Sequence, residues 1–182
     1  DYKQFANTFY SWTRDFSSVV YDGTHSDKRS DLITYQSYNE FSRGINSIPS
    51  SDANYTDNYK HIRRTNLLLQ NAEAYAKPED IKQYIGEAYF FRAYSYFDLL
   101  QLYGDVIITK KPLDITDPEM KVKRNDRSEV VDLIIDDLNH AVENLPAFKE
   151  LTTEEEGRIS KEGAQAFLSS CLLYTSDAAD EG

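Results

Sequence analysis

The stretch Tyr84–Asp105, YIGEAYFFRAYSYFDLLQLYGD, decides the fold. It has the length of a helix, carries aromatic or aliphatic side chains on nearly every side, and contains one arginine, Arg92, near its middle. A surface helix shows one apolar stripe, whereas a helix that is apolar nearly all round lies inside a domain. The stretch ends at Gly104–Asp105, before a short apolar run at Val106–Ile108. We therefore predict a central helix buried between others.

A second helix is predicted immediately before this stretch, over residues 54–76. Its apolar side is marked by Ile62, Leu69 and Ala76. Pro78 suits the first turn of the following helix, because proline lacks an amide hydrogen that would be unpaired there. A link this short predicts that the two helices lie antiparallel.

Further helices are predicted on both sides of this pair. Downstream, Asp126 and Glu129 have the spacing of a capping box, which starts a helix over 127–145. Ser160 is placed to cap a last helix from Lys161. Upstream, apolar residues three and four apart predict a helix over 2–21. The pattern over 32–48 permits a second helix but does not decide it. Val106–Thr109 is predicted to be a short strand or an extended piece.

The resulting fold class is all-α. The helices form two hairpins, over 54–103 and 127–170, and paired helices that repeat in this way are typical of tetratricopeptide-like stacking. We predict one helical domain over residues 1–170.

Several short motifs resemble one known family, in the same order along the chain. They are Tyr59–Leu69, Gly86-Glu87-Ala88, Arg92-Ala93, Tyr96–Leu99, Leu102–Asp105, Arg124–Val131 and Gly157–Lys161. Together they are similar to the signature segments of the SusD/RagB family of nutrient-binding lipoproteins. The residues that carry this structural signature are Tyr59, Asn66, Gly86, Glu87, Arg92, Tyr103, Gly104 and Asp105.

The resemblance implies a function as well as a fold. Members of this family capture oligosaccharides at the surface of the Gram-negative outer membrane and act as a lid on a TonB-dependent SusC-like transporter. They bind and deliver their ligand without cleaving it, and the helical scaffold faces the transporter. The chain would be the amino-terminal half of such a protein. Attachment to the membrane is expected only through a lipid anchor, on a segment that precedes Asp1.

Two other functions stay open at this point. RagB-like members of the family are linked to peptide uptake, and a deep, polar, enclosed cavity would favour peptide over sugar. A row of exposed aromatic side chains would favour sugar. The other alternative is a cytoplasmic tetratricopeptide-like adaptor that binds a partner protein in a helical groove. A lipoprotein signal upstream would exclude the adaptor.

The carboxyl-terminal residues form a separate case. Cys171–Glu181, CLLYTSDAADE, resembles one reading frame of a transposase adapter used to prepare sequencing libraries. We therefore expect residues 171–182 to be a non-native tail. Without its three acids, the net charge changes from −11 to −8. An acidic chain repels nucleic acid at long range, so nucleic acid is not an expected partner.

No arrangement of residues typical of catalysis is present, and we predict that the protein is not an enzyme. His25, His61 and His140 lie in separate segments, without a second ligand at metal spacing. Asp136 and Asp137 are neighbours on a predicted helix and therefore point in different directions. No metal or cofactor is expected. For Arg92 we favour a structural role, with its partner on another helix, because a buried charge needs a partner.

The candidate ligand-binding residues lie outside the central helix. Sugar rings stack on aromatic faces while polar neighbours bond the hydroxyls, and the less regular part of the chain offers both kinds of residue. In the family, ligand contacts come partly from the region just before the helix that begins here near residue 55. Many members have a tryptophan where this chain has Tyr55. The candidates are Tyr35, Tyr38, Asp52, Asn54 and Tyr55.

Overall fold

The computed structural model describes residues 1–13, 50–113, 117–118 and 122–180, with side chains as far as Leu173. Its contacts divide the chain into two units, Asp1–Ser11 with Ala53–Gly182, and Trp12–Asp52. Of the second unit, only residues 12–13 and 50–52 are described. The predicted helix over 32–48 lies outside the described residues, as do residues 14–21 of the helix predicted over 2–21. The described part of the 2–21 prediction is α-helical over Tyr2–Asn7 and continues as a 3₁₀ helix over Thr8–Trp12.

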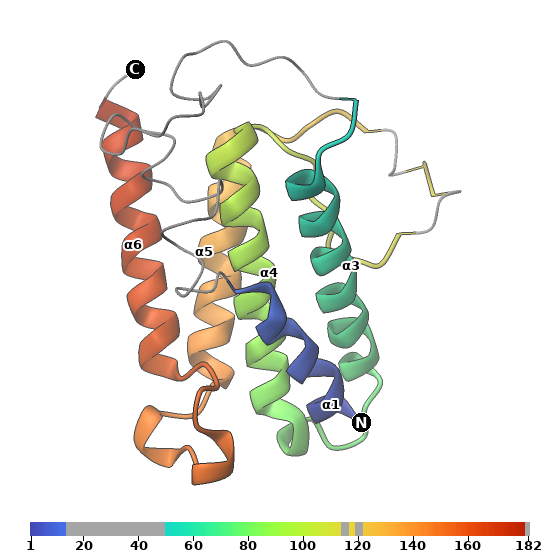
Figure 1. Cartoon of the computed structure of the whole chain (residues 1–182), viewed down its shortest axis with the longest axis vertical. Helices are drawn as coiled ribbons and strands as arrows, with labels where there is room; N and C mark the ends of the chain where they lie inside the picture. The colour runs from blue at the N-terminus through green and yellow to red at the C-terminus, as the bar shows by residue number, and fades with distance from the viewer. Residues whose placement is uncertain (14–49, 114–116, 119–121, 181–182) are drawn as a thin grey trace, which may run out of the picture. The chain divides into compact units, whose positions relative to one another are not determined.

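The first unit is built from helices (Figure 1). Its elements are α1 (Tyr2–Asn7), the 3₁₀ turn η1 (Thr8–Trp12, whose last residue belongs to the other unit), α3 (Ala53–Glu73), η4 (Pro78–Ile81), α4 (Lys82–Tyr103), α5 (Arg127–Asn144), η6 (Phe148–Glu150), η7 (Thr153–Glu155) and α6 (Lys161–Asp180). The described residues contain one isolated antiparallel bridge, between Val106 and Asn125, and no longer strand. The predicted all-α fold class is confirmed.

α4 is the central helix that the aromatic stretch predicts. It packs against α3, α5 and α1, while α6 packs against α5 (Figure 1). Its most enclosed large apolar side chains are those of Phe91, Tyr96 and Leu99, each at most 1% exposed. Burying a large apolar side chain is worth about 1.5–3 kcal/mol, so α4 supplies much of the core.

The helix ends follow local chemistry. At the start of α5 the Asp126 N–H donates to a Glu129 carboxylate oxygen over 3.0 Å, as the capping-box spacing predicts. Ser160 Oγ accepts from the Gly163 N–H over 3.2 Å at the start of α6. α4 ends at Gly104, whose φ of 66° is a conformation that suits glycine. The Gly104 N–H bonds the Leu100 carbonyl over 3.0 Å and closes the last turn.

The predicted end of the helix over 54–76 is also wrong. α3 ends at Glu73 and not at residue 76, and Ala76 is exposed and not part of the apolar side. The Tyr75 N–H reaches the Ala72 carbonyl over 3.1 Å, which tightens the chain into a turn. Lys77 precedes Pro78, and the residue before a proline is disfavoured in the helical region. Pro78 begins a 3₁₀ turn before α4, as its missing amide hydrogen allows.

Gly86 marks the closest approach of α4 to the end of α5. A Cβ at this position would lie 2.9 Å from Leu145 Cγ and 3.0 Å from the Leu145 backbone nitrogen. We expect Gly86→Ala to destabilise the protein, because overpacking costs about 1–3 kcal/mol and exceeds the gain of about 1 kcal/mol in helix propensity. Urea unfolding measures the change.

Gly163 provides a matched control, since a Cβ there would meet Ile159 Cδ1, the flexible end of a side chain, at 2.7 Å. Gly163→Ala is therefore expected to be neutral or stabilising. Equal effects of the two substitutions would contradict the close packing at Gly86.

α6 continues across residue 170 as far as Asp180. Cys171 is buried, and burial raises the pKa of its thiol to about 12, whereas Leu172 and Leu173 are exposed. The division of the chain at residue 170 stays a prediction. None of the helices in the described residues has both the length and the apolar character to cross a membrane.

Candidate ligand-binding site

The segment after α4, residues 106–113, is irregular and bends at residues 110–111, and side chains from the helices bind its backbone. The Tyr59 hydroxyl accepts from the Ile107 N–H over 2.9 Å and donates to the Ile107 carbonyl over 2.8 Å. Tyr96 does the same at Thr109, over 2.8 Å and 3.2 Å. Backbone polar groups buried without partners are costly. The two tyrosines supply the hydrogen bonds that a neighbouring strand would otherwise provide.

Two asparagines complete this support. Asn66 Nδ2 donates to the carbonyls of Thr109 and Lys111, over 2.9 Å and 3.3 Å. Asn125 Oδ1 accepts from the Ile108 N–H over 2.9 Å, and the Asn125 N–H donates to the Val106 carbonyl over 2.9 Å. The segment is therefore fixed at successive residues, although it belongs to no sheet.

Arg92 links Asn66, one of the residues that bind this segment, to the buried Asp137 of α5. Its Nε and Nη2 donate to the two Asp137 carboxylate oxygens over 2.8 Å and 2.6 Å, and its Nη1 donates to Asn66 Oδ1 over 2.8 Å. Arg92 is 5% exposed and Asp137 is fully buried. Burial raises the pKa of Asp137, and hydrogen bonds from Arg92 oppose that rise. The partner lies on another helix, as the sequence predicts, and Asp136 is exposed while Asp137 points inwards.

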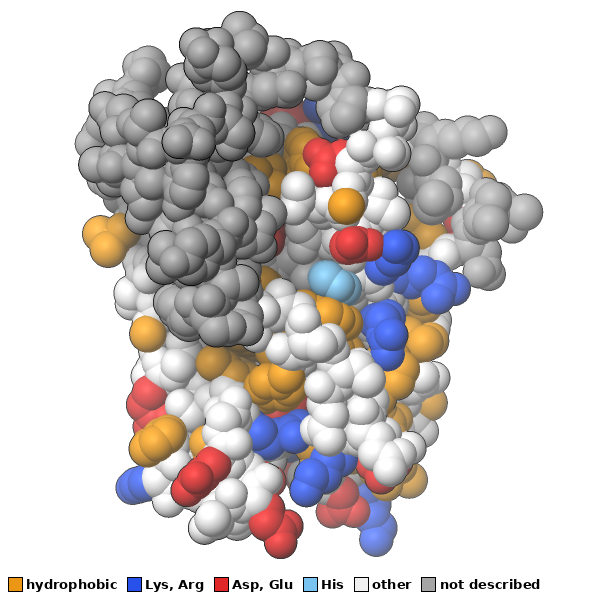
Figure 2. Space-filling model, viewed as in Figure 1, with side chains coloured by type: hydrophobic (Ala, Val, Ile, Leu, Met, Phe, Trp, Pro, Cys, Tyr) orange, Lys and Arg blue, Asp and Glu red, His pale blue; other side chains and the backbone are white. Residues whose placement is uncertain are grey.

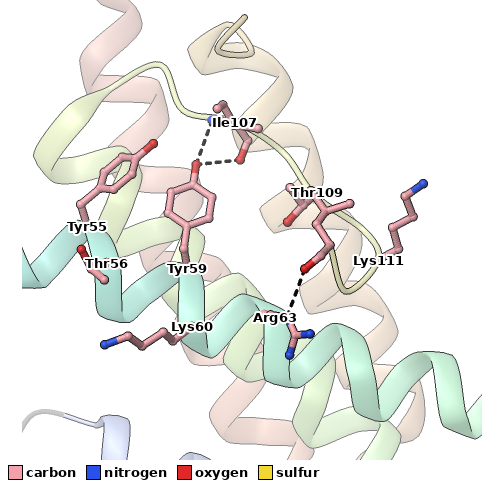
Figure 3. Close-up of a pocket in the computed structure, with 9 residues that line it drawn as sticks. Tyr55, Thr56, Tyr59, Lys60, Arg63, Ile107, Thr109 and Lys111 are labelled. Atoms are coloured by element: carbon pink, nitrogen blue, oxygen red, sulfur yellow. Dashed lines mark hydrogen bonds between the residues drawn. The ribbon is translucent and has the colours of Figure 1, made fainter. Parts of the chain in front are cut away.

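A pocket of about 450 Å³ lies between α3 and the 106–113 segment (Figure 3). Arg63 Nε donates to the Leu113 carbonyl over 3.2 Å at one end. The pocket is lined by side chains from both elements: Tyr55, Thr56, Tyr59, Lys60, Arg63, Ile107, Thr109, Lys111 and Leu113. Its walls are therefore mainly tyrosine rings, aliphatic side chains and the stems of three cationic residues.

The tyrosines at this site are held in contact with one another. The Tyr55 and Tyr59 ring centroids are 4.8 Å apart, and Tyr103 packs edge-on against Tyr55 at 5.3 Å. Figure 3 shows the Tyr55 and Tyr59 side chains extending from α3 towards Ile107. Burial raises the pKa of Tyr59, which keeps its hydroxyl protonated and able to donate. Rings that are fixed in this way lose little freedom when a ligand binds.

Removing the Tyr59 hydroxyl tests whether it supports the pocket wall. Tyr59→Phe leaves the Ile107 N–H and carbonyl without this partner, and because the site is half-buried, the loss of the hydrogen bonding costs about 0.5–1.5 kcal/mol. We expect a loss of stability of that size in urea unfolding. Tyr75→Phe, at a position that is 41% exposed, is the control and should change little. Equal effects of the two substitutions would show that the Tyr59 hydroxyl does not support the wall.

The five candidate ligand-binding residues lie in different parts of the chain's structure. Tyr55 lines the pocket, and Asn54 is exposed in the first turn of α3. Asp52 is half-buried and belongs to the other unit. Tyr35 and Tyr38 lie outside the described residues. The assignment of these five residues as ligand contacts stays a prediction.

The sequence interpretation missed most of the pocket. The sequence predicts only a structural role for Tyr59, and no role in ligand binding for Lys60, Arg63 and residues 107–113. One available signal was the basic run Lys60–Arg64, KHIRR, within a chain of net charge −11. The other was the extended piece after Gly104–Asp105, which had to pack on a helix.

Other signature residues make contacts between elements away from the pocket. Arg158 Nε and Nη2 donate to the Glu87 carboxylate oxygens, each over 2.7 Å, and Nη1 donates to Asn7 Oδ1 over 2.5 Å. Asp105 Oδ1 accepts from the Arg127 N–H over 3.0 Å, which joins the end of α4 to the start of α5. In the part of the chain that the structure describes, no group of three or more His, Cys, Asp or Glu residues could hold a metal ion.

The fold and the site define a protein with tetratricopeptide-like helical hairpins and a preformed pocket along one helix. Residues 5–173 match the family model of SusD-like proteins described as starch-binding and associating with the outer membrane. The chain belongs to this SusD-like family. The resemblance seen in the sequence is confirmed.

Known relatives agree with this assignment. The chain is 36% identical over 104 residues to SusD-like protein P38 of Formosa agariphila, covering 55% of this chain and 20% of that protein. A crystal structure of a SusD-like protein from Bacteroides fragilis superposes with a TM-score of 0.76 at 25% identity, covering 98% of this chain and 35% of that one. A structure described as a laminarin-binding SusD-like protein gives a TM-score of 0.66 at 29% identity, covering 75% and 29%.

Proposed function

We propose that the protein binds oligosaccharides at the cell surface and delivers them to a TonB-dependent SusC-like transporter of the outer membrane. The observation that carries this proposal is the pocket formed by Tyr55, Tyr59 and the 107–113 segment. Pockets that bind small ligands are concave and mostly apolar, with a few placed polar groups. The match to a starch-binding family, and the laminarin-binding relative, favour sugar as the ligand.

The lining supports binding without cleavage. Hydrolysis of a glycosidic bond normally requires two carboxyl groups on either side of that bond. Among the described residues, those that line the pocket include no aspartate and no glutamate. The pocket offers rings for stacking, and hydroxyls and cations for hydrogen bonding. We therefore propose a carrier and not an enzyme.

The location and the partner follow from the family. We propose that the protein is attached to the outer membrane by a lipid anchor, on a segment outside this sequence. The helical hairpins of α3, α4 and α5 would face the SusC-like transporter. The association of the family with the outer membrane supports this location over that of a cytoplasmic adaptor.

Affinity electrophoresis in gels that contain laminarin, starch or other polysaccharides tests the proposal. We expect at least one polysaccharide to retard the protein. Tyr55→Ala should weaken that retention by about two- to tenfold, since one stacked ring is worth about 0.5–1.5 kcal/mol. Tyr75→Ala removes an exposed tyrosine away from the pocket and is the control.

Two results would contradict the proposal. If no polysaccharide retards the protein while a mixture of short peptides binds with micromolar affinity, the ligand is peptide, as in RagB-like members. If a polysaccharide is bound equally well by the Tyr55→Ala variant, the sugar does not occupy this pocket.

A further inference from the structure

Arg92 and Asp137 form an ion pair in the interior of the protein. On the face that Figure 2 shows, lysine, arginine, aspartate and glutamate side chains lie at the surface, where water solvates them. Arg92 is instead 5% exposed and Asp137 is fully buried. Replacing a buried ion pair by apolar side chains is often neutral or stabilising, so such a pair is weak evidence for stability alone. A second role is indicated by the third hydrogen bond of Arg92, to Asn66.

The ion pair sets the direction of the Asn66 side-chain amide. Asn66 lies on α3 and is 1% exposed. A guanidinium donates hydrogen bonds and accepts none, so only the Asn66 oxygen can face Arg92. Arg92 in turn is held by two bonds to Asp137. The NH₂ group of Asn66 must therefore point away from Arg92, towards the 106–113 segment.

This NH₂ group bonds the segment at two residues of the pocket wall. Alternate residues of the segment line the pocket: Ile107, Thr109, Lys111 and Leu113. Asn66 Nδ2 donates to the carbonyls of the middle two, Thr109 over 2.9 Å and Lys111 over 3.3 Å. Together the two bonds span the bend of the segment at residues 110–111. Asn66 therefore holds the bent part of the wall against α3.

Asn66 can influence a ligand only through this wall. Among the described residues, it is not one of those that line the pocket. Tyr59 bonds Ile107 and Tyr96 bonds Thr109, so these tyrosines hold the wall before the bend. The bond from Asn66 to the Lys111 carbonyl extends the support into the bend.

We propose that Asn66 is a positioning residue for ligand binding. The Arg92–Asp137 pair orients its amide, and the amide holds the wall at residues 109–111 in the position that a sugar ring between this wall and α3 requires. The inference rests on the proposed glycan-binding function and identifies the group that prepares the pocket for its ligand. A wall that is in place before binding does not have to be ordered by the ligand, which raises affinity. An apolar pair at positions 92 and 137 could stabilise the core but could not orient the amide.

Asn66→Asp tests the inference with two measurements. The substitution keeps the size of the side chain and an acceptor for Arg92, but it loses both donors to the segment. The first measurement is amide hydrogen exchange at residues 107–109, whose N–H groups bond side chains of Tyr59, Asn125 and Tyr96. The second is retention in affinity electrophoresis gels that contain laminarin or starch. We expect faster exchange and about tenfold weaker retention, because apparent affinity falls with the fraction of molecules whose wall is in place.

A second variant, Arg92→Met with Asp137→Leu, separates the orientation of the amide from the stability of the core. It keeps Asn66 but removes the partner that orients it, and an apolar pair should recover much of the stability that Arg92→Met alone loses. We expect faster exchange at residues 107–109 and weaker retention in spite of that recovery. If Asn66→Asp does not fold, this variant provides the same comparison. Gly86→Ala, which strains another contact of α4, is the control and should change neither measurement.

The outcomes separate this inference from the proposed function. Unchanged exchange at residues 107–109 in both variants would overturn the inference, whether or not a sugar binds. Retention of both variants equal to that of the unaltered protein, or an equal effect of Gly86→Ala, would also overturn it and leave glycan binding in place. Failure of every polysaccharide to retard the unaltered protein would overturn the proposed function, and the inference with it.

Discussion

Replacing Arg92 with methionine is expected to lower the free energy of unfolding by about 3–5 kcal/mol. Its guanidinium is the bidentate partner of Asp137, which has no exposed surface, and it also donates to Asn66 Oδ1. The substitution leaves the Asp137 carboxylate buried without its countercharge. The free-energy cost of this unpaired buried charge exceeds the net stabilisation that the ion pair provided. Urea unfolding followed by circular dichroism measures the change.

A double-mutant cycle shows whether the loss of stability comes from the Asp137 carboxylate that is left without a countercharge. Arg92→Met with Asp137→Leu removes both charges and should recover a large part of the stability lost by Arg92→Met alone. Lys82→Gln, at an exposed position on the same helix, is the control and should stay within about 0.5 kcal/mol. A double variant as unstable as the sum of the two single variants would show that the two residues act independently.

Replacing Arg158 with methionine is expected to cost a similar amount, about 3–5 kcal/mol. Glu87 is fully buried and loses both of its bonds from Arg158. Burial raises the pKa of Glu87, and Arg158 opposes that rise. The same guanidinium lies 5.2 Å from the Tyr10 ring centroid and bonds Asn7.

This second substitution should also have a local effect, which Arg92→Met should not show to the same extent. Because Arg158 binds Asn7, its loss should release α1 from α4, and amide hydrogen exchange over residues 5–7 should become faster. Arg158→Lys keeps the charge but loses the two-pronged geometry, so an intermediate loss of stability is expected. Unchanged exchange over residues 5–7 would contradict the role of Arg158 in holding α1.

The sequence was sufficient to predict the helices because their signals are local. The apolar surface of Tyr84–Tyr103 on nearly every side predicts its central place, and the Asp126–Glu129 spacing predicts the start of α5. Pro78 predicts the interruption before α4. The same proline does not explain the error at Ala76, because it restricts Lys77 and still permits a helix as far as Ala76.

The site was harder to predict because its contacts join distant residues. Tyr59 meets Ile107 across 48 positions, and Arg92 meets Asp137 across 45. Neither separation produces a pattern within a window of helix length. A tyrosine that bonds a backbone also has the same sequence appearance as one that packs in the core. The family resemblance predicts structural roles for Tyr59, Asn66, Glu87 and Arg92. The structure shows which groups each of these side chains bonds.

A crystal structure of the protein with an oligosaccharide bound tests the central claim most directly. The account predicts a sugar ring against Tyr55, between α3 and the 107–113 segment, with the bonds of Tyr59 to Ile107 unchanged. A sugar bound at another surface, with this pocket empty or filled by another part of the protein, would contradict it.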